Sequence, residues 1–459
     1  MTAIDPQVAI SERSGGRSVQ DYLGKDPTPA PELFRTSQPG FFGTADIPKE
    51  RYLSPDWHHR EMERMWARSW QAACHSQEIP EVGDHTIYEV GCWSFLVVRT
   101  APDTVKAFYN ACQHRGTKLK IDRGHSTELR CPFHGWTWDL DGRLRTVPGE
   151  WDFPQLDRDA AALCEVRADT WGGFVFICLD PEAPTLQEWI GPLPDHFESL
   201  PYEQRRLVAH VRRILPCNWK LGLEAFLESY HVPSTHPQNT MNTNDLDTQY
   251  DILSERVNRM ITLVGVPGPT VGYDLDDQEI LDSLAESGMV GPDGKPLQVP
   301  DGMTARQVLG EFARAAFSYL TGADLTGLSI SELIDGHEYH VFPNFVPWAG
   351  LGIPFAYTFT PYGDDPDRCV WDVYVLWPHP AGEPFPPVPP VRFVNDDELY
   401  SAVQELSWVG PLFDQDMENL RRFQQGMKTL PKPGLIMSSY QESRIRHYHH
   451  LLEQYVCGE

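Results

Sequence analysis

After a polar, proline-rich start, the chain runs through short stretches in which apolar and polar residues alternate. Alternation with a period of two is typical of half-buried strands. It predicts strands at residues 85–90, 94–100, 105–110, 136–145 and 173–179. Asp141-Gly142, inside the fourth stretch, favours a tight hairpin turn. The sequence therefore predicts a small, mostly β domain at residues 51–180, preceded by an N-terminal arm with a short helix at residues 1–50.

The pattern changes after residue 180. Apolar residues then recur at helical spacing near residues 218–231, 276–288, 304–320 and 396–427. Apolar runs between these helices predict strands of an antiparallel sheet at residues 338–345, 352–360 and 369–377. We therefore expect an α+β protein whose second domain spans residues 181–459, with a lid-like insertion at about 265–335.

Composition narrows the classes of protein. The chain has 38 Lys+Arg against 65 Asp+Glu, a formal charge of -27 that repels nucleic acids and anionic membranes. Residues 1–24 contain no apolar signal core, and no stretch approaches the roughly 20 apolar residues of a membrane span, so we expect a cytoplasmic protein. The nine cysteines are an odd number, which favours reduced thiols over a disulfide framework. Cys164, Cys178 and Cys369 lie in apolar runs and are expected in the core.

Two cysteines have a histidine close by. Cys112 precedes His114, and after 16 intervening residues Cys131 precedes His134. A structural zinc site uses the same ligand types in a tetrahedral arrangement and is one interpretation. The common order, Cys first and His second, favours another, because two parallel loops then give both thiolates to one metal and both imidazoles to a second metal. A Rieske [2Fe-2S] centre has that arrangement.

The flanking sequences support the second interpretation. NACQHRG at residues 110–116 and CPFHGW at residues 131–136 resemble the two cluster-binding loops of Rieske proteins. The resemblance makes Cys112, His114, Cys131 and His134 the cluster ligands.

A second group of candidate ligands follows in the expected helix at residues 218–231. Glu228 and His231 are three residues apart and would share one helical face, while Pro233 is expected to stop the helix so that His236 can return to the same metal. Two imidazoles and one carboxylate form the facial triad of non-haem Fe(II) oxygenases, which leaves positions open for dioxygen. The simpler interpretation is a pair of histidines at a helix end with no metal.

This segment resembles the mononuclear-iron helix of Rieske oxygenase alpha subunits, in the subgroup that reads Glu-x-x-His-x-x-x-x-His. Many members carry Asp at the position of Glu228, and often Asn at that of Ala225. In the family the third ligand is an Asp on a late helix, and residues 413–420 offer Asp414 and Asp416. Helical spacing places Asp416 on the apolar stripe that includes Phe413, Leu420, Phe423 and Met427, so we predict Asp416 as the ligand and Asp414 as a solvated or first-turn acid.

Four other histidines are weaker candidates. We expect His447, His449 and His450 on the solvated face of a polar C-terminal helix, and His340 as a core residue among strands.

The whole pattern resembles the alpha subunits of Rieske non-haem iron oxygenases, the aromatic-ring-hydroxylating dioxygenase family. The resemblance implies a small all-β Rieske domain inserted in a helix-grip-like catalytic domain, with a [2Fe-2S] cluster and Fe(II) as cofactors. It implies a homotrimer, possibly with beta subunits, in which one protomer's cluster faces its neighbour's iron and Glu228 bridges the two centres. Electrons would come from NAD(P)H through a separate reductase, sometimes with a ferredoxin. Since no Gly-x-Gly-x-x-Gly loop is present, the chain itself is expected to bind no nicotinamide or flavin.

The sequence says least about the substrate. We favour an aromatic, alicyclic or steroid-like compound over a quaternary ammonium compound. Two alternatives from other classes stay open: a Rieske electron-transfer protein without oxygenase activity, and a zinc-dependent hydrolase using His231, His236 and Asp416.

Overall fold

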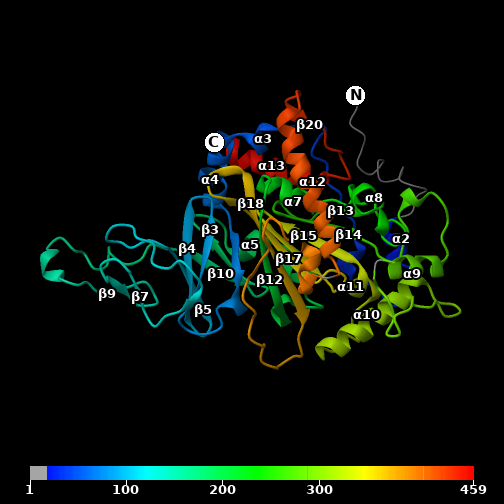
Figure 1. Cartoon of the computed structure of the whole chain (residues 1–459), viewed down its shortest axis with the longest axis horizontal. Coiled ribbons are helices and arrows are strands. Elements are labelled where there is room, and N and C mark those ends of the chain that lie inside the picture. The colour runs from blue at the N-terminus through cyan, green and yellow to red at the C-terminus, as the bar shows by residue number, and fades with distance from the viewer. Residues whose placement is uncertain (1–17, 287, 407, 459) are drawn as a thin grey trace.

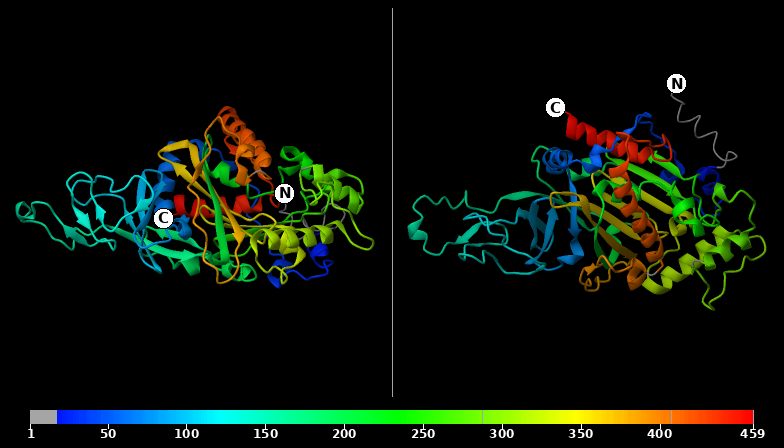
Figure 2. Two further views of the ribbon diagram at one scale, coloured as in Figure 1. Left: turned by 60° about the horizontal axis from the view of Figure 1, so that its bottom comes forward. Right: turned by 45° about the horizontal axis from the view of Figure 1, so that its top comes forward.

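The computed structural model describes residues 18–286, 288–406 and 408–458. The molecule is elongated, with a narrow β-rich unit at one end and a larger unit of helices and sheet at the other (Figure 1). The views in Figure 2 show the same two units side by side along the long axis.

The β-rich unit contains an antiparallel sheet of order β2-β11-β10-β5-β4-β3-β6 and a small sheet of order β7-β8-β9 at its far end. Its strands are β2 (Gln71–His75), β3 (Asp84–Val90), β4 (Trp93–Ala101), β5 (Thr104–Tyr109), β6 (Gly124–His125), β7 (Leu129–Arg130), β8 (Thr137–Trp138), β9 (Leu144–Thr146), β10 (Glu165–Trp171) and β11 (Phe174–Cys178). Five of them, β3, β4, β5, β8 and β11, coincide with predicted strands.

The predicted hairpin turn is also present. Gly142 has a φ of 88° and donates its N–H to the carbonyl of Asp139, a conformation that glycine adopts without strain. This turn divides the strand expected at residues 136–145 into β8 and β9. Cys164 is exposed, contrary to expectation, because it precedes β10 at the surface, whereas Cys178 and Cys369 are buried as predicted.

The larger unit is built on a sheet of order β13-β14-β15-β16-β17-β18-β12-β19, antiparallel except for the parallel contact between β12 and β19. Its strands are β12 (Arg205–Leu215), β13 (Gln249–Ile252), β14 (Val257–Thr262), β15 (Gly336–Val341), β16 (Phe345–Ala349), β17 (Phe355–Tyr362), β18 (Asp365–Pro378) and β19 (Arg392–Phe393). Nearly every residue of β14 to β17 is buried, because helices and loops cover this part of the sheet on both faces.

Helices α7, α12 and α13 lie over this sheet, and α9 to α11 form a separate group with a core of its own (Figure 1). The helices of the larger unit are α5 (Leu186–Ile190), α6 (Leu193–His196), α7 (Trp219–Glu224), α8 (Val232–Thr235), α9 (Asp277–Glu286), α10 (Ala305–Thr321), α11 (Ile330–Ile334), α12 (Gly410–Thr429) and α13 (Ser443–Cys457). Short 3-10 helices across the chain are Glu32–Arg35, Trp66–Arg68, Ser76–Glu78, Glu150–Asp152, Tyr202–Gln204, Pro237–Asn239, Pro269–Val271, Tyr400–Ala402 and Gln404–Leu406. Within the described ranges, no helix is both long and apolar enough to cross a membrane.

Two predicted helices have different bounds. The helix expected at residues 218–231 ends at Glu224, and the one expected at 396–427 begins only at Gly410. Pro233 lies in the first turn of α8, so it starts a helix where we expected it to stop one. Proline fits a first turn because the N–H that it lacks has no partner there.

The segment before β2 packs on the larger unit. Strand β1 (Ile47–Pro48) pairs with β20 (Gly434–Leu435), and α3 (Glu50–Leu53) and α4 (Pro55–Arg64) contact β18 and α13, respectively. Earlier still, Gln20 of α2 (Val19–Leu23) donates a hydrogen bond to Gln249 of β13. The described chain therefore runs first along the larger unit, leaves it to form the β-rich unit and returns, which confirms the predicted insertion. The boundaries at residues 50 and 180, and the lid role of residues 265–335, stay predictions.

Candidate metal centres

The two Cys/His loops lie at the far end of the β-rich unit and share one backbone design. In the first loop Gly116 donates its N–H to the carbonyl of Cys112, and in the second Gly135 donates to Cys131. The two cysteine N–H groups donate in turn to Thr117 and Trp136, five residues ahead in each case. Both glycines have positive φ, 77° and 73°. Two equivalent turns thus present one cysteine and one histidine each.

The side chains of these loops meet. The thiols of Cys112 and Cys131 are close enough for each to shift the pKa of the other, and the imidazole rings of His114 and His134 are 4.7 Å apart. Trp136 stacks on His114 at 5.1 Å and orients its ring. His114 Nδ1 is buried and has no hydrogen-bond partner in the described chain. Paired thiols on one side and paired imidazoles with an unused nitrogen on the other fit a [2Fe-2S] cluster better than a tetrahedral zinc ion.

The histidine side of this site faces outward. His134 is exposed, and the neighbouring Phe133 is 60% exposed although it is a large apolar residue. Arg115 lies over the Phe133 ring at 5.5 Å. This side of the site is therefore accessible to another molecule.

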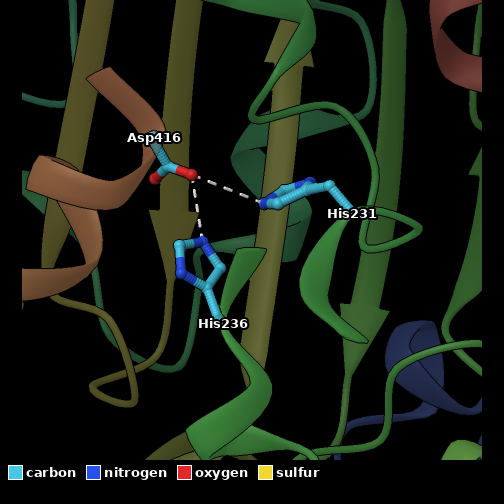
Figure 3. A group of neighbouring side chains, drawn as sticks. All are labelled: His231, His236 and Asp416. Atoms are coloured by element: carbon cyan, nitrogen blue, oxygen red, sulfur yellow. Dashed lines mark ion pairs between the residues drawn. The ribbon is translucent and has the colours of Figure 1, made fainter. Parts of the chain in front are cut away.

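The second group of candidate ligands comes together over the large sheet. Asp416 Oδ1 lies 3.0 Å from His236 Nε2 and 3.8 Å from His231 Nε2, and one ligand atom of each residue lies within 4.8 Å of the others (Figure 3). Two ligand atoms about 2.1 Å from one metal and at right angles to each other are about 3 Å apart. The three side chains therefore fit a single metal ion bound on one face.

The outer nitrogen of each imidazole is held in place. His231 Nδ1 is 2.8 Å from Glu228 Oε1, and His236 Nδ1 is 2.8 Å from Gln415 Oε1. An acceptor at Nδ1 keeps the proton there and leaves Nε2 free to bind a metal. Gln415 was missed in the sequence because it lies next to Asp416 and nothing in a helical pattern distinguishes it.

The surrounding charges favour a cation at His231. Burial lowers the pKa of this imidazole, but Glu228, then Asp416 and Glu338, raise it, and the resulting pKa is about 9. The same negative field favours a metal ion at Nε2 over an empty site. Asp416 is buried, and so are Phe413, Leu420 and Met427 of its predicted stripe, whereas Phe423 is 45% exposed.

Asp414 was expected to be a solvated or first-turn acid, but it is half-buried and lies beyond the first turn of α12. Its carboxylate accepts the backbone N–H groups of Tyr400 and Ser401, at 2.7 and 3.1 Å, and so fixes the loop before α12. His447 and His449 are likewise buried, contrary to expectation, because α13 packs across the molecule; His450 is exposed and His340 is buried, as predicted.

A cavity of about 410 Å³ opens beside the triad. His231 and Asp416 line it together with Glu224, Glu228 and Glu442. Burial raises the pKa of Glu224 to about 8, and its carboxylate contacts the hydroxyl of Tyr52 and Nε2 of His449. Sequence reasoning identified Glu228 but not Glu224 and Glu442, since these two come from α7 and from the residue before α13, which are far apart in the chain.

Comparison with known proteins agrees with this geometry. The family model described as "Ring hydroxylating alpha subunit (catalytic domain)" matches residues 196–458, more than half of the chain, and the model described as "Rieske [2Fe-2S] domain" matches residues 69–157. The chain is 32% identical over 194 residues to the carnitine monooxygenase oxygenase subunit of Escherichia coli (strain K12), which is 42% of this chain and 52% of that protein. It is 33% identical over 191 residues to the chlorobenzene dioxygenase subunit alpha of Cupriavidus sp. (strain PS12), 40% of this chain and 42% of that protein. The match thus spans about half the length of each relative.

Solved structures share the fold over nearly the whole chain. A quaternary ammonium Rieske monooxygenase in complex with L-carnitine superimposes with a TM-score of 0.62 and 17% identity over 96% of this chain and 99% of that one. Naphthalene 1,2-dioxygenase with indole bound gives 0.61 and 19% identity over 91% and 93%. The chain therefore belongs to the ring-hydroxylating alpha subunits, proteins that carry a Rieske [2Fe-2S] cluster and a mononuclear iron.

Proposed function

We propose that the protein is the catalytic subunit of an oxygenase that hydroxylates an apolar organic substrate with dioxygen. The observation that carries the proposal is the facial set of His231, His236 and Asp416 in a chain that also holds a separate Cys/His pair of loops. An electron carrier needs only the loops, and a zinc hydrolase needs only the triad. Both sites together are what an oxygenase requires.

The ligand roles follow from the contacts. Cys112, Cys131, His114 and His134 would hold the cluster, and the Nε2 atoms of His231 and His236 with the Asp416 carboxylate would hold Fe(II). When bound, the cluster supplies stored electrons and the iron supplies the site at which dioxygen is reduced. Glu228 and Gln415 hold the two imidazoles in the tautomer that binds metal.

The separation of the sites supports an assembly of several copies. In all views the Cys/His loops lie at one end of the chain, while α8 and α12, which carry triad residues, lie across the large sheet (Figures 1 and 2). Electron transfer within one chain would have to cross the whole molecule. A homotrimer, in which the exposed His134 of one copy enters the acidic cavity of the next, would bring the two centres together.

Glu228 is the proposed contact between copies. Its Oε1 is engaged by His231 Nδ1, and its Oε2 accepts the backbone N–H of His231 at 2.9 Å. A carboxylate oxygen accepts two hydrogen bonds, so Oε2 can also receive a proton donor from a neighbouring His134. Electrons would reach the cluster from a separate reductase, with or without a ferredoxin.

For the substrate, an aromatic, alicyclic or steroid-like compound is preferred, because the cavity beside the triad is also lined by apolar side chains such as Leu420, Phe423 and Ile445. Product identification tests the whole proposal. Protein loaded with both cofactors is chemically reduced and given labelled dioxygen with a substrate panel that includes naphthalene, a steroid and carnitine. Labelled oxygen in an organic product supports the oxygenase; reduction and reoxidation of the cluster without any product supports the electron carrier instead.

A further inference from the structure

Three side chains from neighbouring strands form a row on one face of the large sheet. Glu338 of β15 is directly opposite Met260 of β14 on one side and Trp348 of β16 on the other. Residues directly opposite each other in antiparallel strands project from the same face with their Cβ atoms about 5 Å apart. The Glu338 carboxyl and the Trp348 indole are therefore neighbours.

This row lies beneath the triad. Met260 Sδ is 3.9 Å from the hydroxyl of Ser229, which lies between Glu228 and His231 in the chain. On the other side, the Trp348 ring contacts Tyr357, whose ring contacts Phe413, one turn before Asp416 on α12.

Charge interactions place Glu338 near the same centre. Burial is the largest influence on the pKa of Glu338 and raises it to about 8, Glu228 raises it further, and Arg444 and His231 act in the opposite direction. The Glu338 carboxyl is therefore mostly protonated at pH 7 and ionised at pH 9.

Two polar atoms in this row are buried and unused. Glu338 Oε1 accepts a hydrogen bond from Arg444 Nη1 at 2.9 Å, but Oε2 has no partner among the described residues. The indole Nε1 of Trp348 is also without a partner in the described ranges. Leaving a buried polar group unpaired is costly, so an acceptor and a donor on neighbouring residues near a reactive centre point to a ligand that pairs with both.

We propose that Glu338 and Trp348 recognise a neutral hydroxyl group on an apolar, ring-containing substrate. One hydroxyl can donate to Glu338 Oε2 and accept from Trp348 Nε1, because it carries one donor and two acceptor positions. A quaternary ammonium group has no N–H to donate, and ionised Glu338 would repel a carboxylate. The inference rests on the proposed function, since it takes the region beneath the triad as the place where substrate binds.

Binding of three matched probes tests the inference. Indane, 2-indanol and 2-indanone share one bicyclic skeleton and differ only in having no polar group, a hydroxyl or a carbonyl. In calorimetric titrations of the holoenzyme at pH 9, above the pKa of Glu338, 2-indanol should bind at least about 10-fold more tightly than indane, the factor expected when one ligand group satisfies two buried atoms.

Two variants sharpen the test. In Glu338→Gln the amide oxygen can still accept the hydrogen bond from Arg444, while the NH₂ group takes the place of Oε2. The site then presents two hydrogen-bond donors and should prefer 2-indanone to 2-indanol. In Trp348→Phe the ring stays and the donor is lost, so the affinity for 2-indanol should fall towards that for indane.

Matched controls lie elsewhere in the chain. Glu332, in the N-terminal cap of α11, is a buried glutamate with one oxygen that has no partner among the described residues. Trp66 has a buried indole N–H that likewise has no partner among them. Glu332→Gln and Trp66→Phe should keep the wild-type order of affinities. Equal binding of indane and 2-indanol, no binding of either, or equal shifts in the controls would overturn the inference. Retained preference without oxygen-dependent product formation from any substrate would instead refute the proposed function alone.

Discussion

A buried histidine joins the β-rich unit to the large sheet and makes the stability of the protein depend on pH. His210 of β12 places Nδ1 2.9 Å from Glu78 Oε1, and Nε2 2.7 Å from Asp372 Oδ1. Glu78 belongs to the inserted unit and Asp372 to β18, where Arg212 binds it as well. With a carboxylate at each nitrogen, the imidazole is held in its charged form.

The size of the effect follows from the pKa. Burial lowers the pKa of His210, but Glu78 and Asp372 outweigh it and raise the pKa from 6.5 to about 9. A shift of this size corresponds to about 3 kcal/mol of stability at 1.36 kcal/mol for each pKa unit. Because the folded-state pKa is the higher one, this contribution is complete below pH 6.5, decreases as the pH rises, and is gone above pH 9 or so.

Thermal unfolding of wild type and His210→Gln at several pH values measures this contribution. At pH 6.5 the variant should have a Tm lower by about 6 °C, since 1 kcal/mol shifts the Tm of a large domain by roughly 2 °C. The difference in Tm between wild type and variant should be much smaller at pH 9.5. His340→Gln is the matched control: burial lowers the pKa of His340 to about 3, so this residue is neutral throughout and its gap should not vary with pH. A His210→Gln gap that is the same at both pH values would refute the charge argument.

Three further predictions concern the metal centres. Asp416→Ala should lose the mononuclear iron and keep a reducible cluster. Asp414→Ala should keep both cofactors and lose about 1 kcal/mol of stability, because two backbone N–H groups lose their acceptor. If iron analysis shows the reverse, Asp414 and not Asp416 is the third ligand. Cys112→Ser should lose the cluster absorption while the triad still binds iron, and a variant that keeps the absorption would exclude this cysteine as a ligand. Glu228→Gln should bind both cofactors but slow the reoxidation of the reduced cluster by dioxygen at least about 10-fold; stopped-flow traces like those of wild type would exclude Glu228 as the bridge.

Motifs with local spacing were predictable from the sequence. The order of Cys112 and His114, repeated in Cys131 and His134, indicated two equivalent loops before any tertiary contact was known, and the structure has two such loops. Asp416 could be distinguished from Asp414 because a helix of five turns separates buried from exposed positions by periodicity alone. Both inferences used only residues close together in the chain.

Features that depend on distant partners were missed. Strand β12 carries Arg205, Arg206, Arg212 and Arg213. These charged residues obscured the alternation of buried and exposed positions, so no strand was predicted there. Arg205 is nevertheless buried, because it donates to the carbonyls of Trp348 and Gly350, more than 140 residues away. The sequence around β12 gives no indication of these distant backbone acceptors.

His449 shows the same limit. Among polar neighbours it looked solvated, yet its imidazole meets Glu224 and Tyr52 in the interior. A pattern of polar residues at helical spacing indicates a solvated face only when no buried polar partner faces it. Here the partners are 225 and 397 residues distant, so the helix could not be placed from its own composition.

The early end of α7 has a functional consequence. Residues 225–228 are good helix formers, but Ser229 donates its N–H to the hydroxyl of Tyr250 on β13, and this tertiary contact prevails over helix propensity. In a continued helix the N–H of His231 would donate to the carbonyl of residue 227 and would be closed to any side chain. Because the helix has ended, that N–H is available to Glu228 Oε2, while His231 Nδ1 holds Oε1. Both oxygens of the carboxylate are thus fixed by a single histidine, which orients the imidazole and the proposed bridge with the same two hydrogen bonds.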